Sequence, residues 1–337
     1  DWSASMDQMQ RSLPNVQSAS LVACWFGDDL RAGHCSIRPG VERTQKVTRP
    51  VSWQVAGVDR ENAYTVTQVD DRPAYGGTPS DNSVIQAIAD LKARGIKPVL
   101  TPFLLLDIDA DNQLPNPYTG LPGQPAYPWR GRITLDPAPG HAGSPDQTAA
   151  ATAQIASFIG TAAPADFAVI DGQVVYGGPA EWSYRRFILH YAHLAVAAGG
   201  VDAFVIGTEM RALTWARDGA GSYPFVTALA QLAADVKSVL GAATLVTYAA
   251  DWSEYFGHQP DDGSGDVYFH LDPLWASPDI DAIGIDLYWP LADWRDGRDH
   301  IDAAVARSIY DIDYLKSNIN GGEGFDWYYA SDADRIN

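Results

Sequence analysis

The sequence predicts an α/β protein with a (β/α)8, TIM-barrel-like fold. Strand-like apolar runs alternate with helical patterns along most of the chain. The segments that enter the strands are short, as at Gly95-Ile96-Lys97, whereas those that leave them are long and rich in Trp, Tyr, Pro, Gly and Asp. A barrel whose functional site is built from strand-to-helix loops has this asymmetry.

Five apolar runs are predicted to be strands, and one further strand is expected early in the chain. The five runs are Ser20–Phe26, Pro98–Leu106, Ala203–Thr208, Thr244–Ala249 and Ile280–Leu287. Either Val51–Val58 or Ala63–Val69 is expected to be the second barrel strand, and the alternation does not distinguish them. Closure needs eight strands, so about six of eight predict an incomplete barrel.

Helices are predicted between these strands from apolar spacing and capping residues. The N-cap pair Ser80-Asp81 opens one helix that ends at Gly95, and Ser144-Pro145 opens another that runs to about Ile159. The remaining helices are Glu181–Ala198, Phe225–Leu240 and His300–Leu315, and Phe167–Tyr176 is a β-like excursion. Asp107–Gly143 has no periodicity, and an irregular loop of this length is usually functional.

Composition bounds the organisation of the chain and its partners. The 337 residues suit one large domain, which we place at 20–337 after a linker or peripheral segment at 1–19. The chain begins at Asp1 without an initiator Met, so we expect a fragment of a larger protein. A net charge of −19 disfavours nucleic acid as a partner. No apolar run approaches the roughly 18 residues of a membrane span.

Cofactor and metal motifs are not recognised. The sequence has no glycine-rich phosphate loop, nucleophile elbow or CxxC, so we expect no cofactor. The loop from His258 to His270 contains acids and histidines but lacks the spacing of an EF-hand, so no metal is assigned. His190 and His193 favour packing over metal binding. Cys24 and Cys35 could be bridged or reduced.

Carboxylates follow three successive predicted strands. Glu209, Asp251 and Asp286 stand where the strands end, and such acids can serve as proton donor, base, nucleophile or sugar-hydroxyl acceptor. Glu323, in GGEGFDW, is a further candidate acid. The alternatives are a strand-end Glu209 paired with a base such as Arg211, Asp251 and Asp286 as hydrogen-bond acceptors or helix caps, and Glu323 in an exposed turn.

Aromatic residues suggest the ligand. The chain has 11 Trp and 16 Tyr, many in predicted loops, and flat rings suit the C–H faces of sugars. The candidate sugar contacts, besides Asp251 and Asp286, are Trp25, Trp129, Trp252, Tyr288 and Trp289. Packing of loops onto the barrel is the alternative for any one of these rings.

Long motifs resemble a known family. The segments RPAYGGTPSD (72–81), GQPAYPWRGRIT (123–134), EWSYRRFILHYAHLAVAAGGVDAFVIGTEM (181–210), YAADWSEYFGHQPDDGSGDVYFHLDPLW (248–275) and GGEGFDWYYAS (321–331) look like the TIM-barrel-like domain of gene transfer agent and phage tail proteins. The likeness runs from about Ser20 onward. It implies a glycoside-hydrolase-like barrel in a tail-tip, or baseplate hub, protein of a phage-like particle.

The resemblance also implies a function, a location and partners. In the similar retaining (β/α)8 glycosidases, the acid/base Glu ends the fourth strand and the nucleophile Glu ends the seventh. Counting either early run as strand two places Glu209 at the acid/base position, although Thr208 replaces the usual preceding Asn, and Glu323 is the only late candidate nucleophile. The implied partners are polysaccharide or peptidoglycan and other tail proteins, for a particle made in the bacterial cytoplasm that acts at the cell envelope. A non-catalytic structural or receptor-binding domain is the alternative.

Overall fold

A computed structural model describes residues 2–288, 291–292 and 294–319. It divides into two compact units, Asp1–Asp286 and Leu287–Asn337, and each is described by itself. The prediction of a single domain at 20–337 stays a prediction. In the described residues, no helix combines the length and the apolar character that a membrane crossing needs.

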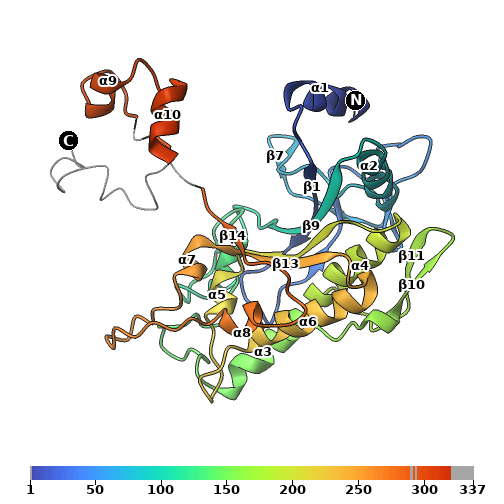
Figure 1. The fold of residues 1–337 in the computed structure, drawn as a ribbon. Helices are drawn as coiled ribbons and strands as arrows, with labels where there is room; N and C mark the ends of the chain where they lie inside the picture. The colour runs from blue at the N-terminus through green and yellow to red at the C-terminus, as the bar shows by residue number, and fades with distance from the viewer. Residues whose placement is uncertain (1, 289–290, 293, 320–337) are drawn as a thin grey trace. The chain divides into compact units, whose positions relative to one another are not determined.

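The first unit is built on a six-stranded sheet in the order β14-β13-β12-β9-β1-β2 (Figure 1). Five of the strands are parallel, and β2 (Ile37–Arg38) is antiparallel to its neighbour β1. The parallel strands are β1 (Ser18–Gly27), β9 (Lys97–Leu106), β12 (Ala203–Thr208), β13 (Leu245–Asp251) and β14 (Gly284–Asp286). All five predicted strand runs are therefore found, and the predicted α/β fold class with a parallel sheet is confirmed.

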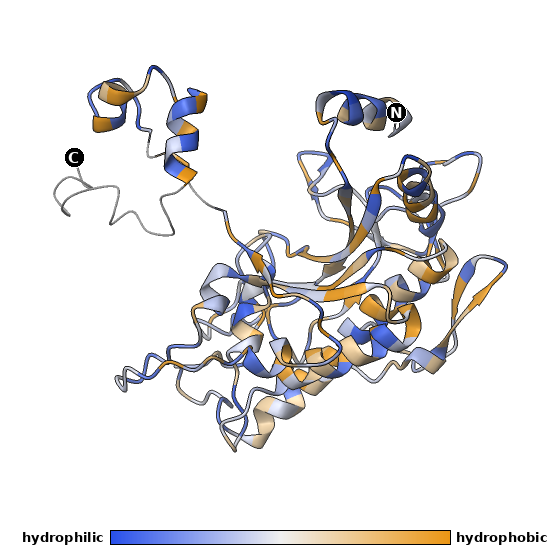
Figure 2. Ribbon diagram, in the orientation of Figure 1, coloured by the Kyte–Doolittle hydropathy of each residue, from blue (hydrophilic) through white to orange (hydrophobic). Residues whose placement is uncertain are grey.

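Amphipathic helices cover this sheet. They are α2 (Asp81–Ala93), α3 (Ala149–Ile159), α4 (Tyr184–Ala197) and α6 (Pro224–Leu240). In Figure 1, α3, α4 and α6 lie side by side, and α4 buries an unbroken run from Phe187 to Ala195. The strands and α4 carry much of the apolar colour in Figure 2, because parallel strands and the helices on them exclude water from both faces of a sheet.

Side-chain caps set where the helices begin. Ser80 accepts a hydrogen bond from the Ser83 N–H at the start of α2, as predicted. The predicted start of α3 at Ser144-Pro145 is wrong, since the helix begins after Thr148, whose side chain accepts from the Ala150 N–H. Gln147 has φ +63°, and a residue with positive φ cannot continue a right-handed helix.

The predicted second barrel strand is not present in the described sheet. β1 pairs directly with β9, from Ser18 opposite Lys97 to Gly27 opposite Leu106. The segment from 40 to 73 instead contains short two-residue strands: β3 (Gly40–Val41), β4 (Gln54–Val55), β5 (Val58–Asp59), β6 (Tyr64–Thr65), β7 (Gln68–Val69) and β8 (Arg72–Pro73). A tight turn at Ala56-Gly57 breaks the first run, and a second turn, at Asp70-Asp71, directly follows the other run; φ is positive in both turns. Glu209 therefore follows the third parallel strand of this sheet, and the predicted count to the fourth is wrong.

The remaining elements of the first unit are short or peripheral. α1 lies within the predicted peripheral segment, and a β-hairpin forms at the predicted excursion. Cys24 and Cys35 are free thiols, and burial raises their pKa values to about 11 and about 12. The elements are α1 (Trp2–Ser12), η1 (Arg130–Arg132), η2 (Pro164–Asp166), β10 (Phe167–Ile170), β11 (Gln173–Tyr176), α5 (Arg211–Thr214), α7 (Trp252–Tyr255) and α8 (Asp272–Trp275).

The second unit contains two described helices where the sequence predicted one at His300–Leu315. They are α9 (Ile301–Val305) and α10 (Ile312–Ile319). The single helix is wrong because Ala306 adopts extended backbone angles, φ −128° and ψ 151°, which end α9. Tyr314 Oη donates to Asp302 Oδ2 over 2.8 Å and links the two helices.

A glycine allows close packing on β12 just before the strand ends. Tyr184 of α4 is 1% exposed and donates from Oη to the Ile206 carbonyl over 2.9 Å. A Cβ at Gly207 would lie 2.0 Å from that Oη. Since the ring of Tyr184 is also held against Phe158, with centroids 5.4 Å apart, it has no room to retreat.

We predict that Gly207→Ala lowers the free energy of unfolding by about 1–3 kcal/mol, the usual range for overpacking a dense core. Chemical denaturation measures this loss. Gly177→Ala is the matched control, because no atom lies within 4 Å of its added Cβ. If both variants unfold at the same denaturant concentration as the unmodified protein, the close packing of Tyr184 on β12 is incorrect.

Candidate active site

Glu209 stands at the mouth of β12 in an unusual backbone conformation. Its N–H donates to the Ala249 carbonyl of β13 over 2.8 Å, which extends the parallel pairing by one residue. Its φ is +51°, a left-handed value that few residues other than glycine adopt. Such a conformation costs on the order of 1–3 kcal/mol and is found most often at functional sites. The fold therefore holds the Glu209 side chain in this direction despite an unfavourable backbone conformation.

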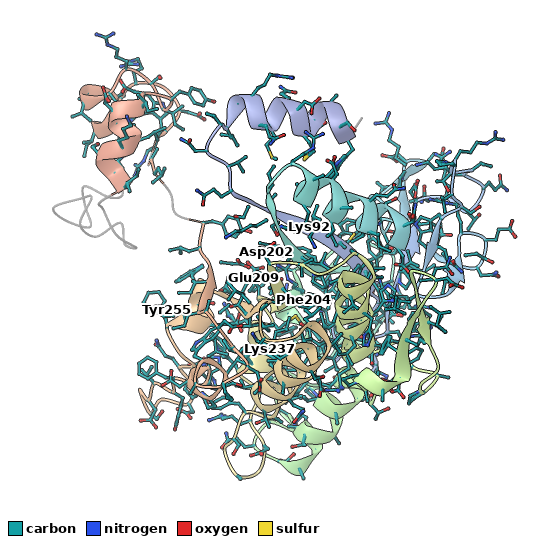
Figure 3. All side chains as sticks on the ribbon, turned by 45° about the vertical axis from the view of Figure 1, so that its right-hand side comes forward. Lys92, Asp202, Phe204, Glu209, Lys237 and Tyr255 are labelled. Carbon is teal, nitrogen blue, oxygen red and sulfur yellow. The ribbon has the colours of Figure 1, made fainter. Side chains whose placement is uncertain are left out.

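The Glu209 carboxylate is buried and fixed on one side only. The side chain is 5% exposed, and Figure 3 labels it together with Tyr255 of α7. Trp129 Nε1 donates to Oε2 over 2.7 Å, and Arg130 Nη2 donates to the same oxygen over 2.6 Å. In the described part of the chain, Oε1 receives no hydrogen bond. One oxygen is thus used to position the group, and the other is left for a ligand.

Arg130 is the buried counter-ion of Glu209. It lies in η1, within the long loop after β9, and is 7% exposed. Its Nε donates to the carbonyl and the Oγ1 of Thr208, over 3.0 and 2.7 Å, and its guanidinium lies 3.8 Å from the Phe103 ring centroid. Burial lowers the pKa of Arg130, and the charge of Glu209 opposes that fall.

Asp286 and Asp251 converge on the same edge of the sheet, as predicted. The two residues are register partners at the ends of β14 and β13. Burial, and then the charge of Glu209, raises the pKa of Asp286 to about 6. Asp251 caps α7 by accepting from the Ser253 N–H over 3.0 Å, so the predicted alternative role as a cap is the one that its contacts support.

A buried network supports the backbone beside Glu209. Tyr248 Oη accepts from the Met210 N–H over 2.7 Å and donates to Glu254 Oε1 over 2.9 Å. Thr214 Oγ1 and the Asp251 N–H also donate to Glu254, each over 2.7 Å. Burial raises the pKa of Glu254 to about 7 despite these donors. The network ties α5, α7 and β13 to the residue that follows Glu209.

The first unit has a hollow of about 380 Å³. It is lined by Trp129, whose Nε1 binds Glu209, and by Tyr118, Arg132, Arg211 and Trp215. The ring of Trp129 lies directly on the backbone of Gly131, where an added Cβ would be 2.4 Å from Cη2. Aromatic walls with a few polar groups at one end are typical of small-molecule sites.

A larger hollow, of about 630 Å³, lies elsewhere in the first unit. It is lined by residues of the β1-to-α2 connection, including Glu42, Trp53 and Arg60, and by none of the strand-end carboxylates. We place the candidate site at the smaller hollow because one of its lining residues, Trp129, donates a hydrogen bond to Glu209.

The predicted aromatic contacts have different outcomes. Trp129 donates a hydrogen bond to Glu209. Trp252 is 48% exposed at the start of α7, directly after Asp251. Trp25 is wrong as a sugar contact, because its side chain is 0% exposed and packs on Phe187 and Trp182 in the core. Tyr288 is 85% exposed and belongs to the second unit, whereas Trp289 and Glu323 lie outside the described residues.

The histidines of the 258–270 loop bind other side chains. His258 Nδ1 lies 3.0 Å from Tyr223 Oη, and His270 Nε2 lies 3.3 Å from Thr214 Oγ1. Across the described ranges of the chain, no three His, Cys, Asp or Glu residues are grouped as metal ligands.

Sequence reasoning missed Arg130, Tyr248 and the hollow. The motif PWRGR was noted for its likeness to a family, but nothing in a loop arginine signals that it becomes buried beside a carboxylate 79 residues later. Tyr248 lies within a strand, where an aromatic residue is most often core. Its hydroxyl becomes informative only once Glu254 is seen to fold back onto it.

We predict that Arg130→Met destabilises the protein by about 3–5 kcal/mol, because it leaves the Glu209 carboxylate buried without a counter-ion. The double variant Arg130→Met/Glu209→Gln should recover part of this loss. Asp7→Asn, which breaks the exposed Arg94–Asp7 pair, serves as the control and should have a much smaller effect. Equal stabilities of the Arg130 single and double variants in urea would show that the two groups are not coupled.

We predict that Glu254 makes the folded state less stable as the pH rises. Its pKa is about 7 when folded against a reference of 4.5, so the folded state holds the proton more tightly and loses that advantage between about pH 4.5 and pH 7. Relative to Glu254→Gln, the free energy of unfolding should fall by about 3 kcal/mol between pH 4.5 and pH 8. Parallel urea titrations at several pH values measure this difference, with Asp261→Asn as an exposed control. A difference that does not change with pH contradicts the raised pKa.

Comparisons with known proteins bear on this fold. Residues 182–337 match the family model of the GTA TIM-barrel-like domain. No curated protein matches the chain. Among solved structures, a complex of a GH113 β-1,4-mannanase is 17% identical with a TM-score of 0.40, over 95% of this chain and 62% of that one. A second structure of a GH113 β-1,4-mannanase is 16% identical with a TM-score of 0.39, over the same shares of the two chains.

A GH113 β-mannanase from Alicyclobacillus acidocaldarius is also similar, at 16% identity and a TM-score of 0.39, over 93% of this chain and 61% of that one. The present chain therefore spans less than two thirds of the length of these enzymes. The family match is independent of them and includes Glu209, Asp251 and Asp286. The match over residues 182–337 supports the resemblance inferred from the motifs in that range.

Proposed function

We propose that this chain is a carbohydrate-binding, glycoside-hydrolase-like barrel that acts on a glycan of the bacterial envelope. The observation that carries this proposal is Glu209, a buried strand-end carboxylate with one oxygen held by Trp129 and Arg130 and no hydrogen bond from the described residues to the other. The adjoining hollow offers indole rings on which a sugar can stack. Polysaccharide or peptidoglycan is the proposed partner.

Glu209 is our candidate for the general acid/base. It donates a proton to the glycosidic oxygen as the C–O bond breaks, while a second carboxylate bonds to the anomeric carbon. Glu209 then takes a proton from water, which displaces this carboxylate from the sugar and gives the retention expected from the family resemblance. Asp286, at the same edge of the sheet, orients the sugar.

The location and the remaining residues of this proposal come from the resemblance. The chain acts at the tip of a phage-like tail, beside other tail or baseplate proteins, after synthesis in the bacterial cytoplasm. The name of the matched domain family supports this setting. Trp252, Tyr288 and Trp289 stay candidate sugar contacts, and Glu323 stays a candidate second catalytic acid.

A non-catalytic structural or receptor-binding domain is the second candidate function. The ion pair itself favours this candidate, since a purely structural role, holding a loop in place, is sufficient to explain a carboxylate bound to a buried guanidinium. A fold alone does not decide between binding and catalysis. Both candidates predict contact with a glycan at the hollow, but only the first predicts bond cleavage.

We predict that the full-length protein releases new reducing ends from envelope polysaccharide or peptidoglycan and that Glu209→Gln lowers the rate by about 10²–10⁴-fold, the usual contribution of a positioned acid or base. Asp286→Asn should also lower the rate, because it removes a candidate sugar contact at the same edge of the sheet. Asp261→Asn is the exposed control. Full activity in Glu209→Gln would remove this residue from the mechanism, and glycan binding without cleavage would favour the structural domain.

We predict that Gly131→Ala weakens glycan binding, because the new methyl group displaces the ring of Trp129 that lies on this glycine. Isothermal titration with the glycan that is cleaved or bound measures the change in affinity, and we expect a loss of about tenfold, equivalent to about 1.4 kcal/mol. Gly177→Ala is the matched control in open space. Unchanged affinity in Gly131→Ala would exclude Trp129 as a stacking wall.

A further inference from the structure

We propose that the hollow beside Glu209 selects a sugar unit that carries an anionic group, a carboxylate or a phosphate. This inference rests on the proposed function, since it names the class of glycan that the same site takes. It is carried by two arginines, Arg132 and Arg211, which line the hollow from separate elements, η1 and α5.

Both arginines are positioned by aromatic rings. The guanidinium carbon of Arg132 lies 4.9 Å from the ring centroid of Tyr118, and that of Arg211 lies 4.3 Å from the ring centroid of Trp215. Stacking on a ring holds the plane of a guanidinium while leaving its N–H edge available. A planar fork of donors held in this way matches the two oxygens of a carboxylate or phosphate.

Among the described residues, neither arginine forms an ion pair with an acid of the protein. The polar side-chain contact of Arg211 is to Ser253 Oγ over 3.3 Å. Glu209 is already paired with Arg130, so it does not neutralise the other two arginines of this region. The charges of Arg132 and Arg211 are therefore available to a ligand.

Other groups of the hollow fit a sugar. Trp215 Nε1 is buried and has no hydrogen-bond partner in the described chain, and a buried donor of this kind is costly unless a ligand satisfies it. Burial, and then the charge of Arg217, lowers the pKa of His258 to about 4, so this neighbour is neutral at pH 7. The positive charge of the hollow therefore comes from Arg132 and Arg211. A sugar hydroxyl at Trp215 and an anionic substituent at the arginines use all of these groups.

The test compares hexasaccharides that share a backbone and differ in charge. Isothermal titration of the protein is done with β-1,4-mannuronate and β-1,4-mannan hexamers, with β-1,4-glucuronate and β-1,4-glucan hexamers, and with 6-phosphorylated β-1,4-mannan. We expect at least one anionic hexamer to bind about tenfold or more tightly than its neutral partner, and the carboxylate and phosphate arms identify the group that is preferred. Added salt should reduce this advantage.

Variants assign the preference to the two arginines. Arg132→Gln and Arg211→Gln should each reduce the anionic advantage several-fold, and the double variant should remove it, so that charged and neutral partners bind equally. Arg72→Gln, an exposed residue of β8, is the control. Equal binding of charged and neutral partners, or an advantage that survives the double variant, overturns this inference and leaves the proposed function standing. Failure of every glycan, charged or neutral, to bind overturns both.

Discussion

The buried pair of Arg130 and Glu209 is the interaction on which the rest of the site depends. It joins the long loop after β9 to the end of β12, and the guanidinium also lies over Phe103 of β9. Removing one of two paired charges from a buried site leaves the other without a partner, which is costly, so the pair fixes both the loop and the side chain. Trp129 is adjacent in sequence to Arg130, and this is why an indole ring is delivered to the same carboxylate oxygen.

Contacts around the ion pair also hold the backbone of Glu209 in an unfavourable conformation. A left-handed backbone at the end of a strand is unfavourable for glutamate, and it persists because neighbouring contacts hold it. The Ala249 carbonyl holds the N–H of Glu209, and Tyr248 holds the N–H of Met210, with Glu254 behind it. A residue that only joined two loops could do so from an ordinary conformation. The cost is explained if the direction of the carboxylate matters for a ligand.

Local patterns in the sequence were sufficient for the sheet and for the convergence of Glu209, Asp251 and Asp286, because parallel strands end at one edge. These patterns did not predict the features of the structure that depend on tertiary contacts or on turns. The runs near Val55 and Tyr64 alternate as strands do, but each forms only two-residue strands, with a tight turn inside the first run and another directly after the second. Trp25 is of a residue type that commonly contacts sugars, but its side chain is buried against Phe187 of α4. Arg130 gave no signal, since burial of a loop cation depends on a partner distant in the chain.

The most direct measurement of this account is a crystal structure of the protein with a bound anionic β-1,4-linked oligosaccharide. We expect a sugar ring stacked on Trp129, its anionic group within hydrogen-bond distance of Arg132 or Arg211, and a glycosidic oxygen facing the open Oε1 of Glu209. A saccharide bound away from this carboxylate, with the hollow left empty, would contradict the central claim that Glu209 is positioned for a glycan.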